Sequence, residues 1–326
     1  MRVEPNYLIF MTGDSKNNEW LVVVNVFAAS KKAGSVWKKA ALMLEEAGVS
    51  YQALFTGGRY NASQLSFNAA KSGYRRFLAV GGDGTVHDVL NGIAEYVESS
   101  ADVTLAEFTL GVLPVGSGND WVKSTGVPRD IQGAVNAIAK ADTSRQDVVK
   151  VVCEEGVSYM ANVGGVGLDA RVCEIVNRKK VQGKRGKKLY VGALLYCIKH
   201  RVPIRARVVC DGKAVFEGKY LSIAFGIGKY SGGGMSQTPL AEIGDGLLDV
   251  TVIPDIPMWT IIKEVSKLFT GTFHKISVLT MAKCREVEVL PYGKADAEPV
   301  EVDGEVTGRV PVKMTVLPDS INVIVG

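Results

Sequence analysis

The chain has 326 residues, of which 47% are hydrophobic and 22% charged, and its formal net charge is +4. This composition is that of an ordinary globular protein and excludes a disordered chain, a collagen and a coiled coil. A length of this size predicts about two domains. No apolar run reaches the ~18 residues of a membrane-spanning helix, and residues 1–20 lack a basic leader, so we expect a cytoplasmic protein without a signal peptide.

Cysteine and histidine usage excludes several kinds of metal and redox site. The five cysteines are widely spaced and include no C-x-x-C pair, and the chain has three histidines. This spacing fits neither a disulfide framework nor a zinc site. Glycine is in excess, with 36 of 326 residues, about 11% against a usual ~7%. The excess is concentrated in a few loops.

The first half of the chain alternates between predicted strands and predicted helices. Apolar runs predict strands over residues 21–26, 51–55, 77–80 and 109–115. Helical spacing of apolar residues predicts helices over 35–47, 63–71, from 85 onward, and over 130–140. Continuous apolar strands that alternate with helices are typical of a parallel sheet covered on both faces. We therefore predict an α/β domain over residues 20–147.

The second half has the pattern of antiparallel hairpins. Residues 148–152 and 157–163 flank one turn, and Asp211-Gly212 separates the predicted strands 205–209 and 214–223. Further short strands are expected at 248–253, 286–290, 300–302, 312–317 and 321–325, with helices at 188–200 and 259–269. This pattern predicts a β-sandwich domain over residues 148–317.

The first glycine cluster, Gly81-Gly82-Asp83-Gly84-Thr85, lies between a predicted strand and a predicted helix. Glycine allows the backbone to approach a ligand closely. A helix N-terminus adds free N–H donors and a partial positive charge, which suit a phosphate. A tight turn capped by Thr85 is the alternative, and this cluster alone does not decide between them.

A second glycine loop, Leu113–Asp120, follows the next predicted strand and also ends in a carboxylate. In a parallel sheet both loops emerge at the carboxyl edge, where open α/β folds bind their ligands. Asp83 and Asp120 facing a bound phosphate would repel it unless Mg²⁺ lay between them. The two loops together therefore favour phosphoryl transfer.

These motifs resemble those of the soluble lipid kinases with a diacylglycerol kinase catalytic domain. The similarity runs from Asn25 to Asp303-Gly304-Glu305 and includes the segments 162–170, 231–235 and 245–250. The G-G-D-G-T element is shared with NAD kinases and phosphofructokinases, but the ordered set is specific to the lipid kinases. The loop that begins at Asn25 departs from the family's Asn-Pro pattern. The resemblance implies an NAD kinase/phosphofructokinase-like first domain, to which the last strand, 318–326, returns.

The resemblance also implies the cofactors ATP and Mg²⁺. ATP would lie against the turn from Gly81 to His87, and Lys32 or its neighbour Lys31 would contact a phosphate. The nucleotide contacts implied in this way are Asn25, Lys32, Thr56, Gly81, Gly82, Asp83, Gly84, Thr85, His87, Ser117 and Asn119. Asp83 and Asp120 would organise the catalytic Mg²⁺.

A structural Mg²⁺ is implied at the loop that contains Asp245. Its ligands would be the Asp245 side chain and the carbonyl oxygens of Glu242 and Leu247. Mixed carboxylate and carbonyl oxygens suit a hard cation. A simple Asp-Gly turn is the alternative.

The triplet Asp303-Gly304-Glu305 is predicted at the end of an alternating strand, so that both carboxylates project to one side. In the resembled family one of them accepts the proton of the lipid hydroxyl while the other orients it or aids Mg²⁺. We expect Glu305 to be the acceptor, with Asp303 as the alternative. On the local pattern alone, a hairpin turn with solvated acids would be favoured.

The expected reaction is transfer of the γ-phosphate of ATP to a lipid hydroxyl, foremost that of diacylglycerol. A dinucleotide oxidoreductase is one alternative, because residues 165–170 fit G-x-G-x-x-A. However, the chain about twenty residues later is basic and lacks the expected ribose-binding acid. The other alternative is a non-catalytic nucleotide- or lipid-binding protein, which the joint presence of Asp83, Asp120, Asp303 and Glu305 opposes.

The positive charge is concentrated in residues 171–219, which hold fourteen Lys or Arg and three acids. The densest part, Arg178–Lys188, could contact an anionic membrane, nucleic acid or only solvent. It lacks interleaved aromatic residues and a groove-reading motif, so we expect no nucleic acid partner. We expect this block to make peripheral contact with the inner membrane surface, where the lipid substrate lies. The sequence leaves a homodimer open.

Overall fold

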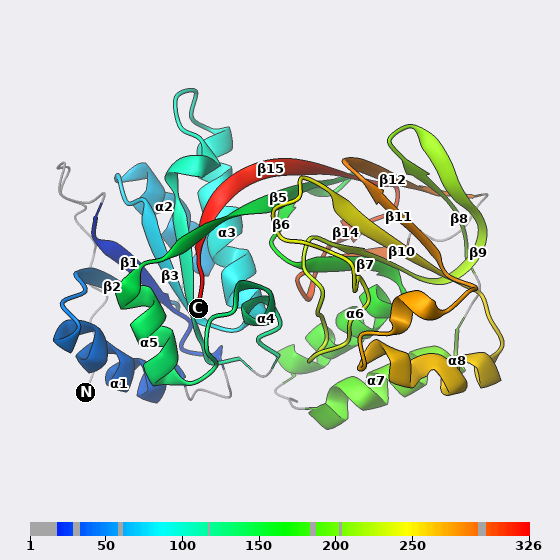
Figure 1. The fold of residues 1–326 in the computed structure, drawn as a ribbon, viewed down its shortest axis with the longest axis horizontal. Helices are drawn as coiled ribbons and strands as arrows, with labels where there is room; N and C mark the ends of the chain where they lie inside the picture. The colour runs from blue at the N-terminus through cyan, green and yellow to red at the C-terminus, as the bar shows by residue number, and fades with distance from the viewer. Residues whose placement is uncertain are drawn as a thin grey trace.

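The computed structural model describes residues 18–28, 33–57, 61–116, 118–182, 187–201, 204–292 and 298–326. Its elements form an α/β domain and an antiparallel β domain that lie side by side (Figure 1). Among the described residues, no helix is both long enough and apolar enough to span a membrane.

The first domain is built on a parallel sheet with the strand order β2-β1-β3-β4. Its strands are β1 (Trp20–Val24), β2 (Tyr51–Phe55), β3 (Arg76–Gly81) and β4 (Thr109–Pro114). Every side chain of β1 is buried, as are those of β3 beyond Arg76. Such runs lie in the interior because helices cover both faces of the sheet.

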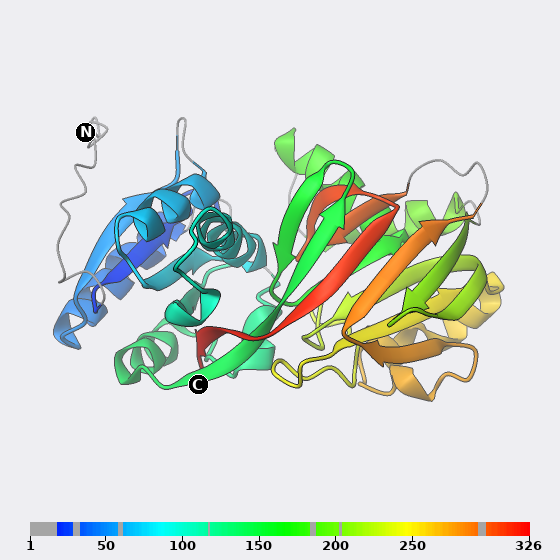
Figure 2. The same ribbon diagram turned by 90° about the horizontal axis from the view of Figure 1, so that it is seen from above.

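Two pairs of helices cover this sheet. The helices α1 (Ala33–Glu46) and α5 (Ile131–Lys140) pack together on one face, and α2 (Ala62–Lys71) packs with α3 (Asp83–Glu98) on the other (Figure 2). The short helices η3 (Leu105–Glu107) and α4 (Trp121–Thr125) complete the domain. The Asp130 carboxylate caps α5 by accepting a hydrogen bond from the Gly133 N–H at 2.8 Å. The α/β class predicted for this half is confirmed.

Every strand pair within the second domain is antiparallel. Its strands are β5 (Thr143–Cys153), β6 (Gly156–Met160), β7 (Val163–Gly167), β8 (Ile204–Cys210), β9 (Lys213–Gly226), β10 (Leu248–Pro254), β11 (Thr280–Cys284), β12 (Glu286–Pro291), β13 (Pro299–Val302), β14 (Glu305–Arg309) and β15 (Val312–Ile324). Buried side chains such as Val208, Val250 and Val289 form its core. The predicted sandwich-like class is confirmed.

Helices lie along one side of the second domain (Figure 1). They are α6 (Leu168–Val181), α7 (Lys187–Lys199), α8 (Met258–Glu264), η4 (Val265–Leu268) and η5 (Phe273–Lys275). The buried contact between α6 and α7 is formed by Val172 and Val176 of α6 with Ala193 and Cys197 of α7.

A long ribbon of β5 and β15 connects the two domains (Figure 1). The end of β15 pairs in parallel with β4 at Asn322 and Val323, so the C-terminus lies in the first domain. The strands expected at 312–317 and 321–325 are therefore one strand, with an irregularity in the β5 pairing between Leu317 and Ile321. Strand β5 crosses the domain boundary predicted at 147/148.

The segment that fits G-x-G-x-x-A differs from the sequence prediction. It forms β7 and the start of α6, a helix that the sequence analysis did not predict. Because β7 pairs antiparallel with both β9 and β13, it is not part of the parallel βαβ unit that a dinucleotide-binding domain requires. The oxidoreductase alternative is therefore wrong.

Candidate active site

The glycine turn after β3 packs against the loop after β4. Gly82 precedes α3, and a Cβ atom on it would lie 3.0 Å from the Cα atom of Gly116. A Cβ atom on Gly116 would lie 2.5 Å from the Cα atom of Gly82. Two glycines are therefore needed for the backbones of these loops to meet, and the meeting point lies at the carboxyl edge of the sheet, as predicted.

Polar side chains surround this glycine edge. The Asn25 amide, just after β1, donates to Thr85 Oγ1 at 3.0 Å. Thr56 Oγ1 and Asn119 Oδ1 are buried and have no hydrogen-bond partner in the described part of the protein. Buried polar atoms without partners suggest a polar ligand. Of the other predicted nucleotide contacts, Lys32 and Ser117 lie outside the described residues.

The carboxylates of Asp83 and Asp120 face the same point. A Cβ atom on Gly118 would lie 3.0 Å from Asp83 Oδ2 and 3.3 Å from Asp120 Oδ2. Burial raises the pKa of Asp83, the Trp121 N–H lowers it in part, and the negative charges of Asp120 and Asp303 raise it further. A cation between the two carboxylates would relieve this repulsion.

These residues fit Mg²⁺, which is commonly held by one or two carboxylates together with substrate phosphates. Within the described residues, no three His, Cys, Asp or Glu side chains are grouped so that they alone could hold a metal ion. The pair Asp83 and Asp120 thus suits an ion that arrives with a nucleotide.

The loop from Ser231 to Met235 connects this edge to the second domain. Its Gly233 N–H donates to Asp120 Oδ2 at 2.6 Å, while the Lys123 ammonium contacts Asp120 Oδ1 at 2.6 Å. Gly232, Gly233 and Gly234 have φ values of 57°, 88° and 114°, which favour glycine. The loop that contains Gly232, Gly233 and Gly234 therefore fixes the orientation of the Asp120 carboxylate.

Asp303 and Gly304 form the turn between β13 and β14, with φ values of 52° and 88°. The expectation that Asp303 and Glu305 alternate along one strand is wrong, because Asp303 lies in the two-residue turn itself, while Glu305 is the first residue of β14. The Asp303 carboxylate is not solvated either: its side chain is 2% exposed. It accepts hydrogen bonds from the N–H groups of Ala161 and Asn162, each at 2.9 Å.

His87 is the third partner of Asp303. Its Nδ1 atom lies 3.1 Å from Asp303 Oδ2, and its side chain is buried. Burial opposes protonation of His87, but the hydrogen bond and charge of Asp303, with the charges of Asp88 and Glu305, outweigh it and raise the pKa. The structure thus places His87 against Asp303, although the resemblance implied a nucleotide contact.

Glu305 lies beside the first turn of α3. Its Oε1 atom is 3.2 Å from the position of a Cβ atom on Gly84, and its Oε2 atom accepts a hydrogen bond from Asn177 of α6 at 3.0 Å. Nearby, partial burial raises the pKa of Asp88 to about 6. The charge of His87 lowers this pKa, and the charge of Glu305 raises it. The two domains thus bring the Glu305 carboxylate against Gly84, in the first turn of α3.

Two further acids were not predicted as site residues. Glu301 is 7% exposed, and its burial raises its pKa well above the usual value. The Gly304 N–H lowers this pKa in part, whereas the negative charges of Asp169, Asp303 and Glu305 raise it further. Asp169 accepts a hydrogen bond from Ser222 Oγ. The repeated acids of E-V-D-G-E were the available signal for Glu301, but its burial between paired strands could not be read from one sequence.

The predicted structural metal loop has a lysine at its carboxylate. Asp245 Oδ2 lies 2.8 Å from the Lys283 ammonium, which is also 3.3 Å from Asp249. Asp245 Oδ1 accepts from the Leu247 N–H at 3.0 Å, and Asp147 accepts from the Gly246 N–H at 2.8 Å. The positive charge of Lys283 thus already compensates Asp245, and metal binding through Glu242, Asp245 and Leu247 stays a prediction.

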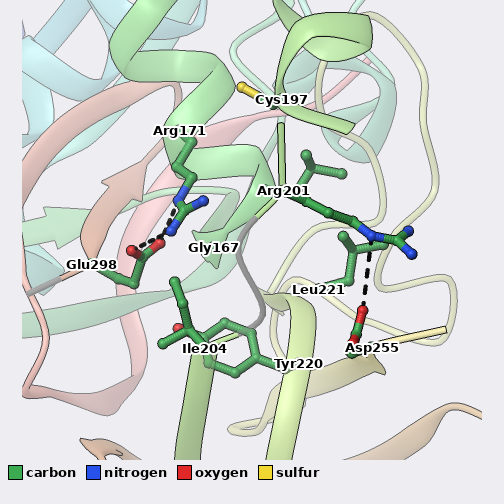
Figure 3. Close-up of a pocket in the computed structure, with 10 residues that line it drawn as sticks. Gly167, Arg171, Cys197, Arg201, Ile204, Tyr220, Leu221, Asp255 and Glu298 are labelled. Carbon is green, nitrogen blue, oxygen red and sulfur yellow. Dashed lines mark hydrogen bonds and ion pairs between the residues drawn. The ribbon is translucent and has the colours of Figure 1, made fainter. Parts of the chain in front are cut away.

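A separate pocket lies between α6, the end of α7 and the strands β8 and β9 (Figure 3). Arg171 donates to both oxygens of Glu298 at 2.7 and 2.6 Å, and Arg201 lies 3.9 Å from Asp255. Because its charges are paired with one another and none of the four predicted catalytic acids lines it, we do not place the reaction there.

An α/β domain with paired aspartates at its glycine edge, joined to a sandwich-like domain that adds Asp303 and Glu305, defines an NAD kinase-like kinase. Residues 19–151 match the Diacylglycerol kinase catalytic domain, and residues 162–325 match the YegS C-terminal NAD kinase beta sandwich-like domain. The chain therefore belongs to the lipid kinase family that these domains define.

Individual relatives agree with this assignment. A protein of Xanthomonas campestris pv. campestris named "Probable lipid kinase YegS-like" is 28% identical over 223 residues, 67% of this chain and 68% of the relative. The protein of Mycobacterium tuberculosis named "Diacylglycerol kinase" is 23% identical over 287 residues, 87% and 88% of the two chains. A crystal structure of a diacylglycerol kinase from Bacillus anthracis has the same fold, with a TM-score of 0.74, 23% identity and coverage of 95% and 97%.

Proposed function

We propose that the protein transfers the γ-phosphate of ATP to the hydroxyl of diacylglycerol, which gives phosphatidic acid. The observation that supports this best is that both domains contribute acids to the glycine edge. Asp83 and Asp120 of the first domain face each other at Gly118, and Glu305 of the second domain lies against Gly84, the residue after Asp83. The relative named diacylglycerol kinase, which aligns with 87% of this chain, supports the choice of lipid.

In this proposal the ATP phosphates lie against Gly81, Gly82 and Gly84. The N-cap residue of α3 is Gly82, which has no side chain that could cap the helix. The N–H groups at the start of α3 can therefore donate to a phosphate. Asn25, Thr56 and Asn119 supply polar contacts, and Lys32 and Ser117 complete the set that the family resemblance implies.

Asp83 and Asp120 would hold Mg²⁺, which supplies positive charge to the transferring phosphate groups. The Lys123 ammonium and the Gly233 N–H each contact one oxygen of Asp120 and fix its orientation, and each oxygen keeps a further lone pair for the ion. Phosphoryl transfer depends chiefly on positioning and charge compensation, since its transition state is loose.

Glu305 is the proposed proton acceptor. The lipid oxygen forms a bond to the γ-phosphorus, the bond from that phosphorus to the bridging oxygen of ADP breaks, and the hydroxyl proton moves to Glu305. Asp303 is a poor acceptor, because His87 and two backbone N–H groups already use its oxygens. Its role is to hold the hairpin that presents Glu305.

Incubation of the pure protein with labelled ATP, Mg²⁺ and a panel of dispersed lipids tests this function. The panel contains diacylglycerol, monoacylglycerol, sphingosine and phosphatidylglycerol. We expect labelled phosphatidic acid as the main product. Faster labelling of another lipid would contradict the substrate, and ATP binding without any labelled lipid would instead indicate a non-catalytic binding protein.

We further propose that the reaction takes place at the inner membrane surface, reached from the cytoplasm. Diacylglycerol resides in the bilayer, so an enzyme acting on it must approach the lipid–water interface. The basic block Arg178–Lys188 is suited to an anionic surface. Residues 183–186 of this block lie outside the described part of the chain.

A further inference from the structure

Large apolar side chains are exposed on α7 and on the segment α8–η4. On α7, Val191, Leu195 and Tyr196 are 51%, 62% and 57% exposed. On and after α8, Trp259, Val265 and Phe269 are 67%, 40% and 61% exposed. We call these six residues the α7–α8 apolar face. Large apolar side chains exposed together on one part of a surface usually mark a contact site.

Helix α7 is apolar on two sides. Ala193 and Cys197 are buried against α6, while Val191 and Leu195, each two residues earlier, are exposed. Residues 187–201 contain no Asp or Glu. A helix that is apolar on more than one face is normally covered on both. The second side of α7 therefore requires an apolar partner.

Contacts at both ends connect α7 with α8–η4 into one surface. After α7, Arg201 pairs with Asp255, which precedes α8 (Figure 3). At the other end, a Cβ atom on Gly232 would lie 2.8 Å from the Tyr190 hydroxyl, and the Ser236 N–H donates to the Leu268 carbonyl at 2.6 Å. Gly232 and Ser236 flank the segment that contacts Asp120, so the surface adjoins the proposed active site.

The charge around this face is positive. Exposed cations in the described part of the chain include Arg178 and Lys179 at the end of α6, Lys199 on α7 and Lys263 on α8. Apolar side chains surrounded by cations are typical of segments that lie in the interface of an anionic bilayer. Tryptophan is also enriched at such interfaces.

We propose that the α7–α8 apolar face inserts into an anionic lipid bilayer and brings the active site to its lipid substrate. This inference rests on the proposed lipid kinase function for its purpose, but docking needs neither ATP nor turnover. The apolar side chains supply the insertion, and the surrounding cations supply attraction to the surface.

Trp259 provides a direct probe. The other three tryptophans, Trp20, Trp37 and Trp121, are 3%, 6% and 2% exposed, so a solvent-dependent change in fluorescence reports on Trp259. Vesicles of phosphatidylcholine and phosphatidylglycerol are expected to shift its emission to the blue. Phosphatidylcholine brominated in its acyl chains, mixed with phosphatidylglycerol, is expected to quench it. The variant Trp259→Phe should lose both changes.

A matched pair of variants tests the face itself. Leu195 on α7 and Leu42 on α1 are 62% and 61% exposed, and both lie on helices. Leu195→Glu should lower vesicle partitioning by about tenfold or more, because one leucine side chain contributes that much when it is buried. Leu42→Glu should leave partitioning unchanged. Circular dichroism and the Tm of each variant verify that it is folded.

Three results would overturn the inference: no blue shift or bromine quenching with wild type, equal vesicle binding by the two leucine variants, or a dimer in solution that Leu195→Glu dissociates. The dimer would identify a second copy as the partner of this face. Kinase activity of Leu195→Glu on detergent-dispersed diacylglycerol should equal that of wild type. A wild-type protein that docks but phosphorylates no lipid would refute the proposed function and not the docking.

Discussion

We expect Asp303→Asn to lower stability, and Glu305→Gln to lower turnover with little change in stability. Asp303 is buried and accepts hydrogen bonds on both oxygens: Asn162 N–H binds Oδ1, while Ala161 N–H and His87 bind Oδ2. An asparagine has one acceptor oxygen. In its less costly orientation the new NH₂ group faces the Asn162 N–H, so that one buried donor is left without an acceptor.

The magnitude follows from these contacts. An unpaired buried N–H costs about 1–3 kcal/mol. The asparagine oxygen still accepts from His87, but this hydrogen bond, worth about 1.5–3 kcal/mol with a charged partner, falls to about 0.5–1.5 kcal/mol between neutral groups. We therefore expect Asp303→Asn to lower the free energy of unfolding by about 2–5 kcal/mol. Glu305→Gln preserves shape at a half-buried position, so its stability should change by only about 0.5 kcal/mol.

Turnover, in contrast to stability, should depend strongly on Glu305. Glu305→Gln removes the proposed proton acceptor and should lower kcat by ~10²-fold or more, while ATP affinity stays near that of wild type. Denaturant unfolding and a steady-state assay with labelled ATP, both at a temperature where each variant is folded, give the two quantities. An Asp303→Asn protein as stable as wild type, or undiminished kcat in Glu305→Gln, would refute this reasoning.

Three further predictions concern pH, metal and membrane. The pKa of His87 is raised above 6.5, so its stabilising charge is present below pH 6.5 and is lost as the pH rises through the raised value. The Tm of wild type should therefore fall over that pH range. The same dependence of Tm on pH in His87→Asn would contradict this. At the Asp245 loop, the predicted metal means that EDTA should lower the Tm of the nucleotide-free protein; an unchanged Tm would show that the Lys283 ammonium alone compensates the Asp245 carboxylate. Replacing Lys184, Arg185, Lys187 and Lys188 by Gln should weaken salt-sensitive binding to anionic vesicles but not activity on detergent-dispersed lipid; equal vesicle binding would leave the block as a solvated segment.

Substitution of Gly82 would not cleanly test whether ATP binds at the glycine turn. Gly82→Val would remove space for a phosphate, but its Cβ atom would also press on the Cα atom of Gly116. Loss of ATP binding in that variant could therefore come from separation of the two loops. Thr56→Val is the better variant, because it removes one buried hydroxyl that has no partner in the described protein and keeps the shape of the side chain.

The sequence by itself determined most of the first domain. Strands β1, β3 and β4 are mostly apolar runs, and the helices have one apolar face, so local pattern and tertiary environment agree. Strand β2 occupies the residues expected, 51–55, and α1 begins two residues before the predicted helix. The two glycine loops and their aspartates could also be located, because parallel strands bring their carboxyl ends to one edge of the sheet.

Only the tertiary structure decided the conformation of β7 and α6 and the roles of the acids beside them. Strand β7 contains three glycines and has little intrinsic preference for a strand; its conformation depends on pairing with β9 and β13 on both sides. The burial of Asp303 likewise depends on residues far away in the chain, His87 and Ala161. Local pattern carries no information about such contacts, because burial and hydrogen bonding are set by segments that meet only in the folded protein.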